Sequence, residues 1–457
     1  MEQKILLGTE PVGRLLFKLS VPTVIAQVIN MMYNLVDRVF IGHIPGEGSL
    51  ALTGVGVCMP LILLVSALAA LVSSGGAPRA SIYMGRNENE YAEKILGGCF
   101  TLQILVSAVF TFVLLLWNEE MLLAFGASER TVEYATAYMN IYAAGTVFVQ
   151  LTLGMSAFIS CQGFTKVSMC SVVIGAVLNI ALDPLFIFIM GMGVKGAALA
   201  TVISQFASCI WVMAFITGKR TVLRLRCSNM RLSPKVILPC IALGTAVFIM
   251  QASEGVISIC FNSSLLNYGG DTAVGTMTIM TSVMMFAMLP LQGIGQGAQP
   301  VISYNYGAGN RGRVKKAFRL LITVSIIYAV LLHLAIMLVP KAFVAVFTTD
   351  RELIEFASPM MRIYFAGLAL MGVQTACQLT LTALGKAVSS IIVAVVRKFV
   401  LLIPLIYILP HVMADRTMAV YMSEPAADVI AVSFTAVLFA FKFRKILKDM
   451  GQTEKLT

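Results

Sequence analysis

Charged residues are scarce in this chain, and their scarcity excludes an ordinary soluble fold. Asp, Glu, Lys and Arg make up 12% of the 457 residues, whereas 58% are hydrophobic and the mean hydropathy is +0.89. Soluble domains are about one quarter charged. The polar surface that a soluble protein of this length needs is therefore missing, and the long apolar runs indicate a chain that resides in lipid.

Several motifs of soluble enzymes and binding domains are also missing. The nine cysteines are scattered without a CxxC pair or ligand-like spacing, which argues against a zinc site and a disulfide framework. The sequence has no P-loop, which argues against ATP-driven transport. It also lacks the paired Asp-rich metal motifs of a membrane-embedded prenyl transferase. We therefore expect no enzymatic activity, no catalytic residues and no cofactor.

Apolar runs of membrane-spanning length recur along the whole chain. A helix needs about 20 apolar residues to cross the hydrocarbon core of a bilayer. Twelve stretches meet this length, and we predict spans at 15–40, 50–74, 95–117, 134–158, 166–190, 194–217, 235–262, 272–299, 317–340, 357–384, 388–411 and 425–447. The sequence thus predicts an all-α, multi-pass membrane protein.

The positive charges are distributed unevenly between the two predicted faces of the membrane. If the N-terminus is cytoplasmic, 24 of the 33 Lys and Arg residues fall on the inside. Five fall outside, and four lie within or at the ends of spans: Arg38, Arg362, Arg397 and Lys398. This excess predicts that both termini are cytoplasmic. It also explains the net charge of +11, so we expect no nucleic-acid partner.

The chain repeats itself at an offset of 222 residues, which separates Gly85 from Gly307 and Gly163 from Gly385. Six spans return the chain to the same side, so the halves have parallel topology, as in many secondary transporters. The sequence predicts two pseudo-symmetric six-helix lobes, with a basic cytoplasmic linker between them. The predicted boundaries are 1–217 for the N-terminal lobe, 218–234 for the linker and 235–457 for the C-terminal lobe.

Asp37 lies in the first predicted span, where an ionisable residue is a candidate for function because it is costly to bury. It shares one helical face with Asn30, Tyr33 and Asn34, since these positions are spaced i, i+3, i+4 and i+7. This polar stripe predicts ion coupling at Asp37 and substrate contact at Tyr33 and Asn34. The alternative is a carboxylate near the end of the span that Arg38 neutralises.

Asp183 lies in the fifth predicted span, four residues after Asn179. Pro184 removes a backbone donor and disturbs the helix here, and the freed carbonyls could help to hold a cation. The alternative is a purely structural Asp-Pro break. Thr201, in the next span, joins this cluster only if the fold brings it there. We hypothesise that Asp37 and Asp183 act as a coupled pair that alternately takes up an ion and releases substrate.

Three polar residues of the second half are candidates for the substrate cavity. Glu254 in the seventh span would have the same role in the second half as Asp37 has in the first. The alternative is that it is a Glu at a bend of the helix near Gly255. Gln374 and Gln378 form an i, i+4 pair in the tenth span. They either contact substrate or join helices by hydrogen bonds.

Four more ionisable residues lie in or near the last two spans. Arg397 and Lys398 in the eleventh span could pair with a carboxylate, and Lys398 could instead extend to the membrane surface. Glu424 and Asp428 frame the outer end of the twelfth span, where we expect them to be solvated.

Five stretches carry a further signal: YNLVDRVFIG (33–42), NIALDPLFI (179–187), GAALAT (196–201), GQGAQP (295–300) and YNYGA (304–308). Together they resemble the multidrug and toxin extrusion (MATE) family, in its bacterial branch of MepA-like and DinF-like transporters. The resemblance covers nearly the whole chain and includes the six-plus-six repeat. It implies a V-shaped pair of lobes with a central cavity that opens alternately to each side.

The resemblance also implies roles for particular residues. The family's first-lobe ion network falls on Asp37, Asn179, Asp183 and Thr201, which makes a Na⁺ site at the first three possible. Glu254 matches an acid that some relatives carry in the seventh span. The tenth span has no Asp or Glu, although some relatives carry an acid there.

We therefore expect a secondary active multidrug efflux antiporter in a bacterial inner membrane. It would export lipophilic, cationic small molecules in exchange for H⁺ or Na⁺ by alternating access, as a monomer within the lipid bilayer. An apolar cavity with a few acids suits such substrates. The alternative is a flippase for lipid-linked precursors, a class with a more cationic cavity, and Arg397 is the residue that favours it.

Overall fold

This computed structural model describes residues 2–453, and helices make up almost all of that stretch. Lys455, one of the 24 Lys and Arg residues predicted to be cytoplasmic, lies outside the described residues. The helices are α1 (Glu2–Thr9), α2 (Val12–Gly42), α3 (Gly48–Gly85), α4 (Asn89–Ala124), α5 (Val132–Cys161), α6 (Thr165–Pro184), α7 (Gly193–Thr217), α8 (Pro234–Gly307), α9 (Arg311–Leu338), α10 (Pro340–Ala345), α11 (Arg351–Tyr364), α12 (Leu368–Ala383), α13 (Ala387–Val395), α14 (Ile403–Val412) and α15 (Arg416–Thr453).

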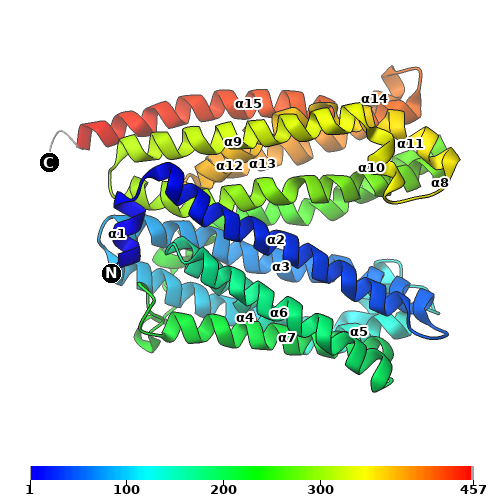
Figure 1. Cartoon of the computed structure of the whole chain (residues 1–457), viewed down its shortest axis with the longest axis horizontal. Helices are drawn as coiled ribbons and strands as arrows, with labels where there is room; N and C mark the ends of the chain where they lie inside the picture. Colours follow the sequence, from blue (N-terminus) through cyan, green and yellow to red (C-terminus); the bar gives the residue numbers. More distant parts are fainter. Residues whose placement is uncertain (1, 454–457) are drawn as a thin grey trace.

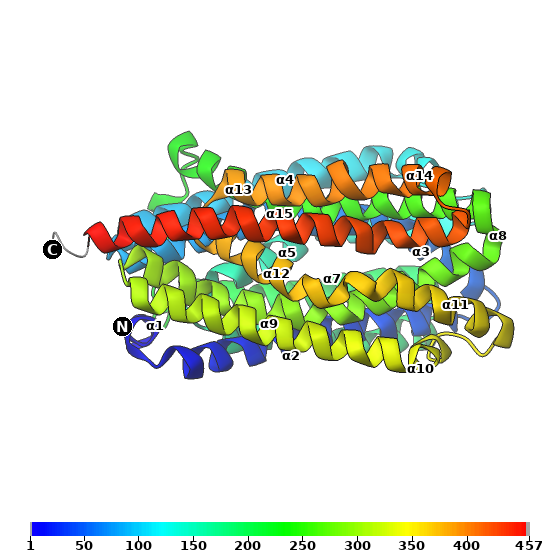
Figure 2. The same cartoon turned by 90° about the horizontal axis from the view of Figure 1, so that it is seen from above.

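Helix α8 accounts for two membrane crossings. Its 74 residues would form a rod of about 110 Å, several times the hydrocarbon thickness of a bilayer. Gly270 breaks it with φ +65° and ψ −163°, a conformation that favours glycine. Helix α8 turns back at the end of the molecule far from α1 (Figure 2). Residues 2–453 contain eleven helical stretches that are long and apolar enough to span a membrane, and dividing α8 confirms the twelve predicted crossings.

Two spans contain a π-helical segment, one in each half of the chain. In the fifth span, residues Leu185–Ile189 follow Pro184, which confirms that this proline disturbs the helix. In the eleventh span, residues Val396–Leu402 join α13 to α14. Such wide turns leave the regular hydrogen-bond ladder and often lie at functional sites.

The twelve crossings form two bundles, α2 to α7 and α8 to α15, which confirms the predicted two-lobe, V-shaped fold (Figure 1). The bundles meet at the end of the molecule where α1 and the end of α15 lie, called here the α1 end, and diverge toward the opposite end. The hydrogen bonds that join them include Thr23 Oγ1 to the carbonyl oxygen of Gly293 (2.6 Å) and Gln27 Nε2 to Gln296 Oε1 (3.2 Å).

The contact between the bundles follows the sequence repeat. A Cβ atom on Gly85 would overlap the backbone carbonyl of Tyr304, and one on Gly307 would overlap the backbone carbonyl of Ile82. Ile82 and Tyr304 are themselves separated by the repeat offset, so the two contacts are mirror versions of each other. Glycine at both positions lets the two helices, α3 and the second half of α8, approach backbone to backbone.

The segment predicted as a linker packs on the first bundle. Gln162 Oε1 at the end of α5 accepts hydrogen bonds from the Thr221 hydroxyl and from the N–H groups of Val222 and Leu223, each at 2.8 Å. Glu93 Oε1 on α4 accepts another from the N–H of Arg224 at 3.1 Å. The exact boundaries of lobes and linker stay a prediction.

Candidate functional site

The four residues predicted to form an ion network meet in the first bundle. Asp37 on α2 and Asp183 near the end of α6 bring their carboxyl groups within hydrogen-bonding reach of each other. Asn179, one turn before Asp183 on α6, donates from Nδ2 to Asp183 Oδ1 (3.2 Å) and makes a longer contact with Thr201 Oγ1 (3.5 Å). Three helices, α2, α6 and α7, therefore supply the cluster.

The cluster has more acceptors than donors. Asp37 Oδ1, Asp183 Oδ2 and Asn179 Oδ1 are buried and receive no hydrogen bond from any group in residues 2–453. A buried acceptor without a donor costs about 1–3 kcal/mol. A bound proton or a metal cation would satisfy these oxygens. The described residues contain no group of three or more His, Cys, Asp or Glu arranged to hold a metal ion, so a Na⁺ ion here would also need amide, hydroxyl or carbonyl oxygens.

Buried tyrosines surround this acidic pair, and the sequence patterns did not single out all of them. Tyr138 on α5 lies close to Asp37 and contacts Thr201, and its ring stacks on that of Tyr142 at 6.1 Å. Tyr33 contacts Gln205 on α7. The i, i+4 spacing of Tyr138 and Tyr142 in an otherwise apolar span was the signal that could have revealed them.

Helix α2 presents two different exposed faces beside the pair. Val21, Ile25, Val28, Met32 and other apolar residues form one exposed stripe at helical spacing, as expected of a surface that contacts lipid. Asn34, predicted to contact substrate, is exposed on another face and donates to the Asn30 carbonyl at 2.6 Å.

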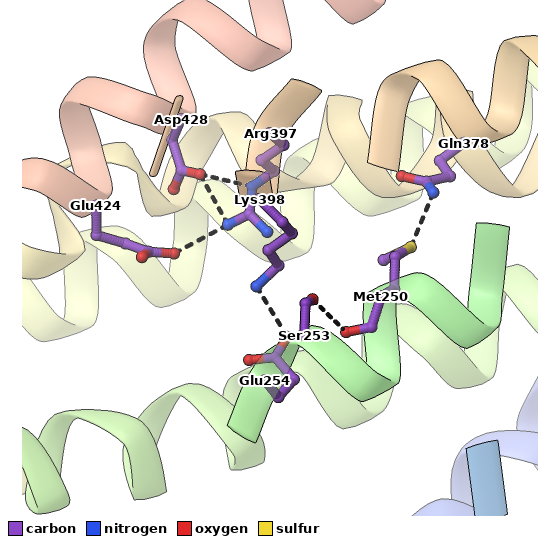
Figure 3. Close-up of polar contacts among 8 residues, drawn as sticks. All are labelled: Met250, Ser253, Glu254, Gln378, Arg397, Lys398, Glu424 and Asp428. Atoms are coloured by element: carbon purple, nitrogen blue, oxygen red, sulfur yellow. Dashed lines mark hydrogen bonds and ion pairs between the residues drawn. The ribbon is translucent and has the colours of Figure 1, made fainter. Parts of the chain in front are cut away.

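The three predicted cavity residues of the second bundle lie on α8 and α12. Glu254 on α8 forms an ion pair with Lys398, with 2.8 Å between Oε1 and Nζ (Figure 3). It therefore already has a cationic partner, unlike Asp37. Gln374 and Gln378 are both buried, and Gln378 Nε2 contacts the Met250 sulfur at 2.8 Å, which joins α12 to α8.

The expectation that Glu424 and Asp428 are solvated is wrong. Both are buried on α15, one helical turn apart, and both contact Arg397: Glu424 Oε1 at 3.0 Å and Asp428 Oδ1 at 2.8 Å (Figure 3). Helix α15 begins at Arg416, so these carboxylates lie two to three turns inside it. Buried charges persist when they are paired, and Arg397 supplies the partner from the π-helical segment.

One protein-family model matches the chain twice, once in each bundle. A family model described as MatE matches residues 22–185 and again residues 246–408. The chain belongs to the MatE family. The two matched stretches lie one in each bundle of this MatE protein, as its internal repeat predicts.

Known proteins resemble this MatE protein over most of its length. The multidrug export protein MepA of Staphylococcus aureus is 24% identical over 411 residues, 89% of each chain. The MepA protein of Staphylococcus haemolyticus is 23% identical over 391 residues, 85% of each chain. The predicted resemblance to MATE transporters is thus confirmed.

Solved structures share its fold. A MATE structure in the bent conformation matches with a TM-score of 0.92 at 21% identity, over 99% of both chains. The outward-facing conformation of a multidrug resistance MATE family transporter of the MOP superfamily matches with a TM-score of 0.90 at 22% identity, over 98% of this chain and 99% of that one.

Proposed function

We propose that this MatE protein is a secondary active multidrug efflux antiporter. It exports lipophilic, cationic small molecules in exchange for H⁺ or Na⁺ by alternating access. The observation that carries the proposal is the contact between the Asp37 and Asp183 carboxyl groups, inside membrane-spanning helices and among oxygens that lack donors.

Electrostatics explains why such a pair exchanges cations. Two unit negative charges about 4 Å apart repel by about 4 kcal/mol at an effective dielectric constant of about 20. A proton, a Na⁺ ion or a cationic substrate relieves this repulsion, and each reduces the affinity of the pair for the others. Uptake of the ion therefore promotes release of the substrate, which is the requirement for antiport.

The arrangement of the bundles supports an assignment of this structure to the outward-open state of the transport cycle. The hydrogen bonds of Thr23 and Gln27 with α8 close the α1 end, whereas the bundles diverge at the other end. The excess of Lys and Arg favours a cytoplasmic position for the α1 end and for both termini. The conformation is then open to the outside, and rocking of one bundle against the other exposes the pair to the cytoplasm.

The surroundings of the protein follow from the same proposal. The twelve spans support a location in a bacterial inner membrane, where the protein would work as a monomer. Its partners are lipid and small organic cations, and it needs no cofactor beyond the coupling ion.

The alternative as a flippase for lipid-linked precursors receives less support from the second bundle. Such a protein needs free positive charge for an anionic headgroup. Arg397 is buried and neutralised by Glu424 and Asp428 at 3.0 Å or less, so it is not free to bind one.

Dye export from proteoliposomes tests the proposal. Purified protein is reconstituted, and ethidium transport is measured under a proton gradient and, separately, under a sodium gradient. We expect one gradient to drive transport in the parent, and Asp37→Asn and Asp183→Asn to lose most of it. Glu120→Gln, a carboxylate exposed at the end of α4, is the matched control. Parent-like export by both Asp variants would refute the carboxylate mechanism.

A further inference from the structure

Two consecutive basic residues lie in the π-helical segment Val396–Leu402 of the second bundle. Arg397 and Lys398 are both buried, although they lie inside a membrane span. They point to different partners: Arg397 contacts α15, and Lys398 reaches the first half of α8 (Figure 3). The wide turn lets neighbouring side chains serve two different helices.

The Arg397 contacts form a closed structural unit. Two carboxylates contact its guanidinium, and the side chains of Arg397, Glu424 and Asp428 are 9%, 6% and 2% exposed. Breaking such a buried network by removing one partner costs several kcal/mol. Arg397 therefore stays with its two acids and is not available to a ligand.

The Lys398 ion pair is different because its two members are unequally buried. The Lys398 side chain is 6% exposed, whereas that of Glu254 is 59% exposed. The Lys398 ammonium group is therefore shielded from water, whereas the Glu254 side chain is accessible to it. Glu254 is thus an exchangeable counter-ion for a fixed, buried cation.

Glu254 faces away from the lipid. Gln251, Glu254 and Ser258 are exposed at i, i+3 and i+7, so they form a polar stripe on α8. Val256 and Ile259 are exposed on a neighbouring apolar face that suits lipid contact. Polar residues inside membrane spans face the protein interior or a water-filled passage. Cys240 and Gly244 lie on the same face of α8 as this stripe, 11 and 7 residues before Gln251, and they approach the backbone of α3 at Gly75 and Leu71. The polar stripe therefore faces the first bundle.

We propose that Lys398 is the binding subsite for a single carboxylate group on an amphiphilic substrate, which takes the place of Glu254. The exchange leaves Lys398 with one carboxylate partner, while the displaced Glu254 carboxylate is solvated. Gln378 supplies a second donor, since its Nε2 contacts a weak acceptor, the sulfur of Met250, one turn from Glu254 on α8.

The charge balance favours a monoanion over a phosphorylated lipid. In the described structure Lys398 has one carboxylate partner to give up, and the neighbouring guanidinium is already occupied by two. A pyrophosphate headgroup would bring further negative charges that meet no free cation. This inference rests on the proposed export function and extends it from cations to carboxylates and zwitterions.

A pair of dyes that differ in one carboxylate tests the subsite. Rhodamine B carries a free carboxylate beside its cationic ring system, and its ethyl ester carries the same ring system without that charge. Both are measured as export from proteoliposomes, and the readout is the ratio of rhodamine B transport to ester transport. Loss of a charge-assisted contact predicts that Lys398→Met lowers this ratio about tenfold or more. Lys398→Arg keeps the charge and should retain most of the ratio.

Further variants separate the possible outcomes. Glu254→Gln removes the competing carboxylate and should raise the ratio, chiefly through a lower KM for rhodamine B. The unfolding temperature of each variant confirms that it is folded. If the parent exports the ester but Lys398→Met leaves the ratio unchanged, the subsite is refuted while the proposed export function stands. Failure of the parent to export the ester refutes that function itself. Lys398-dependent binding of polyprenyl phosphate without any change in the dye ratio would also overturn the carboxylate assignment.

Discussion

Replacing Gly307 by alanine places a methyl group where the two bundles touch backbone to backbone. The added Cβ would overlap the carbonyl of Ile82 on α3, an atom that cannot move without its helix. Overpacking of this kind costs about 1–3 kcal/mol. The cost applies only to the state that is closed at the α1 end, so the population should shift toward opening there by about 5- to 150-fold.

Two cysteines report this opening. Cys99 on α4 and Cys240 on α8 lie on opposite bundles, their thiols contact each other, and both are buried. We expect Gly307→Ala to increase maleimide labelling at both, measured peptide by peptide with mass spectrometry. Cys227, exposed in the linker, calibrates the reagent because its labelling should not change.

A second glycine on the same helix provides the control. Gly275 lies on α8, and apart from its own turn of helix no atom of the described residues is within 4 Å of the position that an added methyl group would take, so Gly275→Ala should label like the parent. Export of ethidium should fall in Gly307→Ala and not in Gly275→Ala. Equal labelling of Cys99 and Cys240 in both variants, with parent-like export, would refute the idea that this contact closes the α1 end.

Two further predictions concern stability. Arg397→Met leaves the buried Glu424 and Asp428 carboxylates without a cation and should destabilise the protein by about 3–5 kcal/mol, seen as a lower unfolding temperature in detergent. Adding Glu424→Gln and Asp428→Asn to this variant should restore much of the lost stability. An unfolding temperature of Arg397→Met equal to that of the parent would contradict the proposed ion-pair network. Gln162→Ala removes the acceptor of three linker hydrogen bonds and should speed proteolytic cleavage of the linker. Thr217→Ala, which removes a local contact on α7, is its control, and equal cleavage rates would show that Gln162 does not anchor the linker.

Much of the architecture followed from local properties of the chain. Apolar runs of sufficient length predicted all twelve crossings, because lipid demands a minimum apolar length from every helix. The repeat offset predicted two matched halves. The sequence did not reveal that several helices are longer than their spans, such as α3, which continues to Gly85. Those extra turns lie where helices contact each other, and hydropathy does not report such contacts.

The candidate site was only partly predictable. Asp37 and Asp183 stood out because a carboxylate in an apolar run is costly and therefore has a purpose. Thr201 could be included only as a conditional member, and Tyr138 was missed, since both join the cluster through the packing of α5 and α7. Asp428 was misjudged because its exposure was inferred from its distance to the end of a span.

The sequence by itself determined that this chain crosses the membrane twelve times, in two related halves, and which carboxylates lie within the spans. Only the tertiary structure decided how those charges are partnered. Asp37 faces another acid, Glu254 faces Lys398, and Arg397 is shared between Glu424 and Asp428. The physical reason is that hydropathy depends on each residue alone, whereas the partners of a buried charge come from other helices, far away in the sequence.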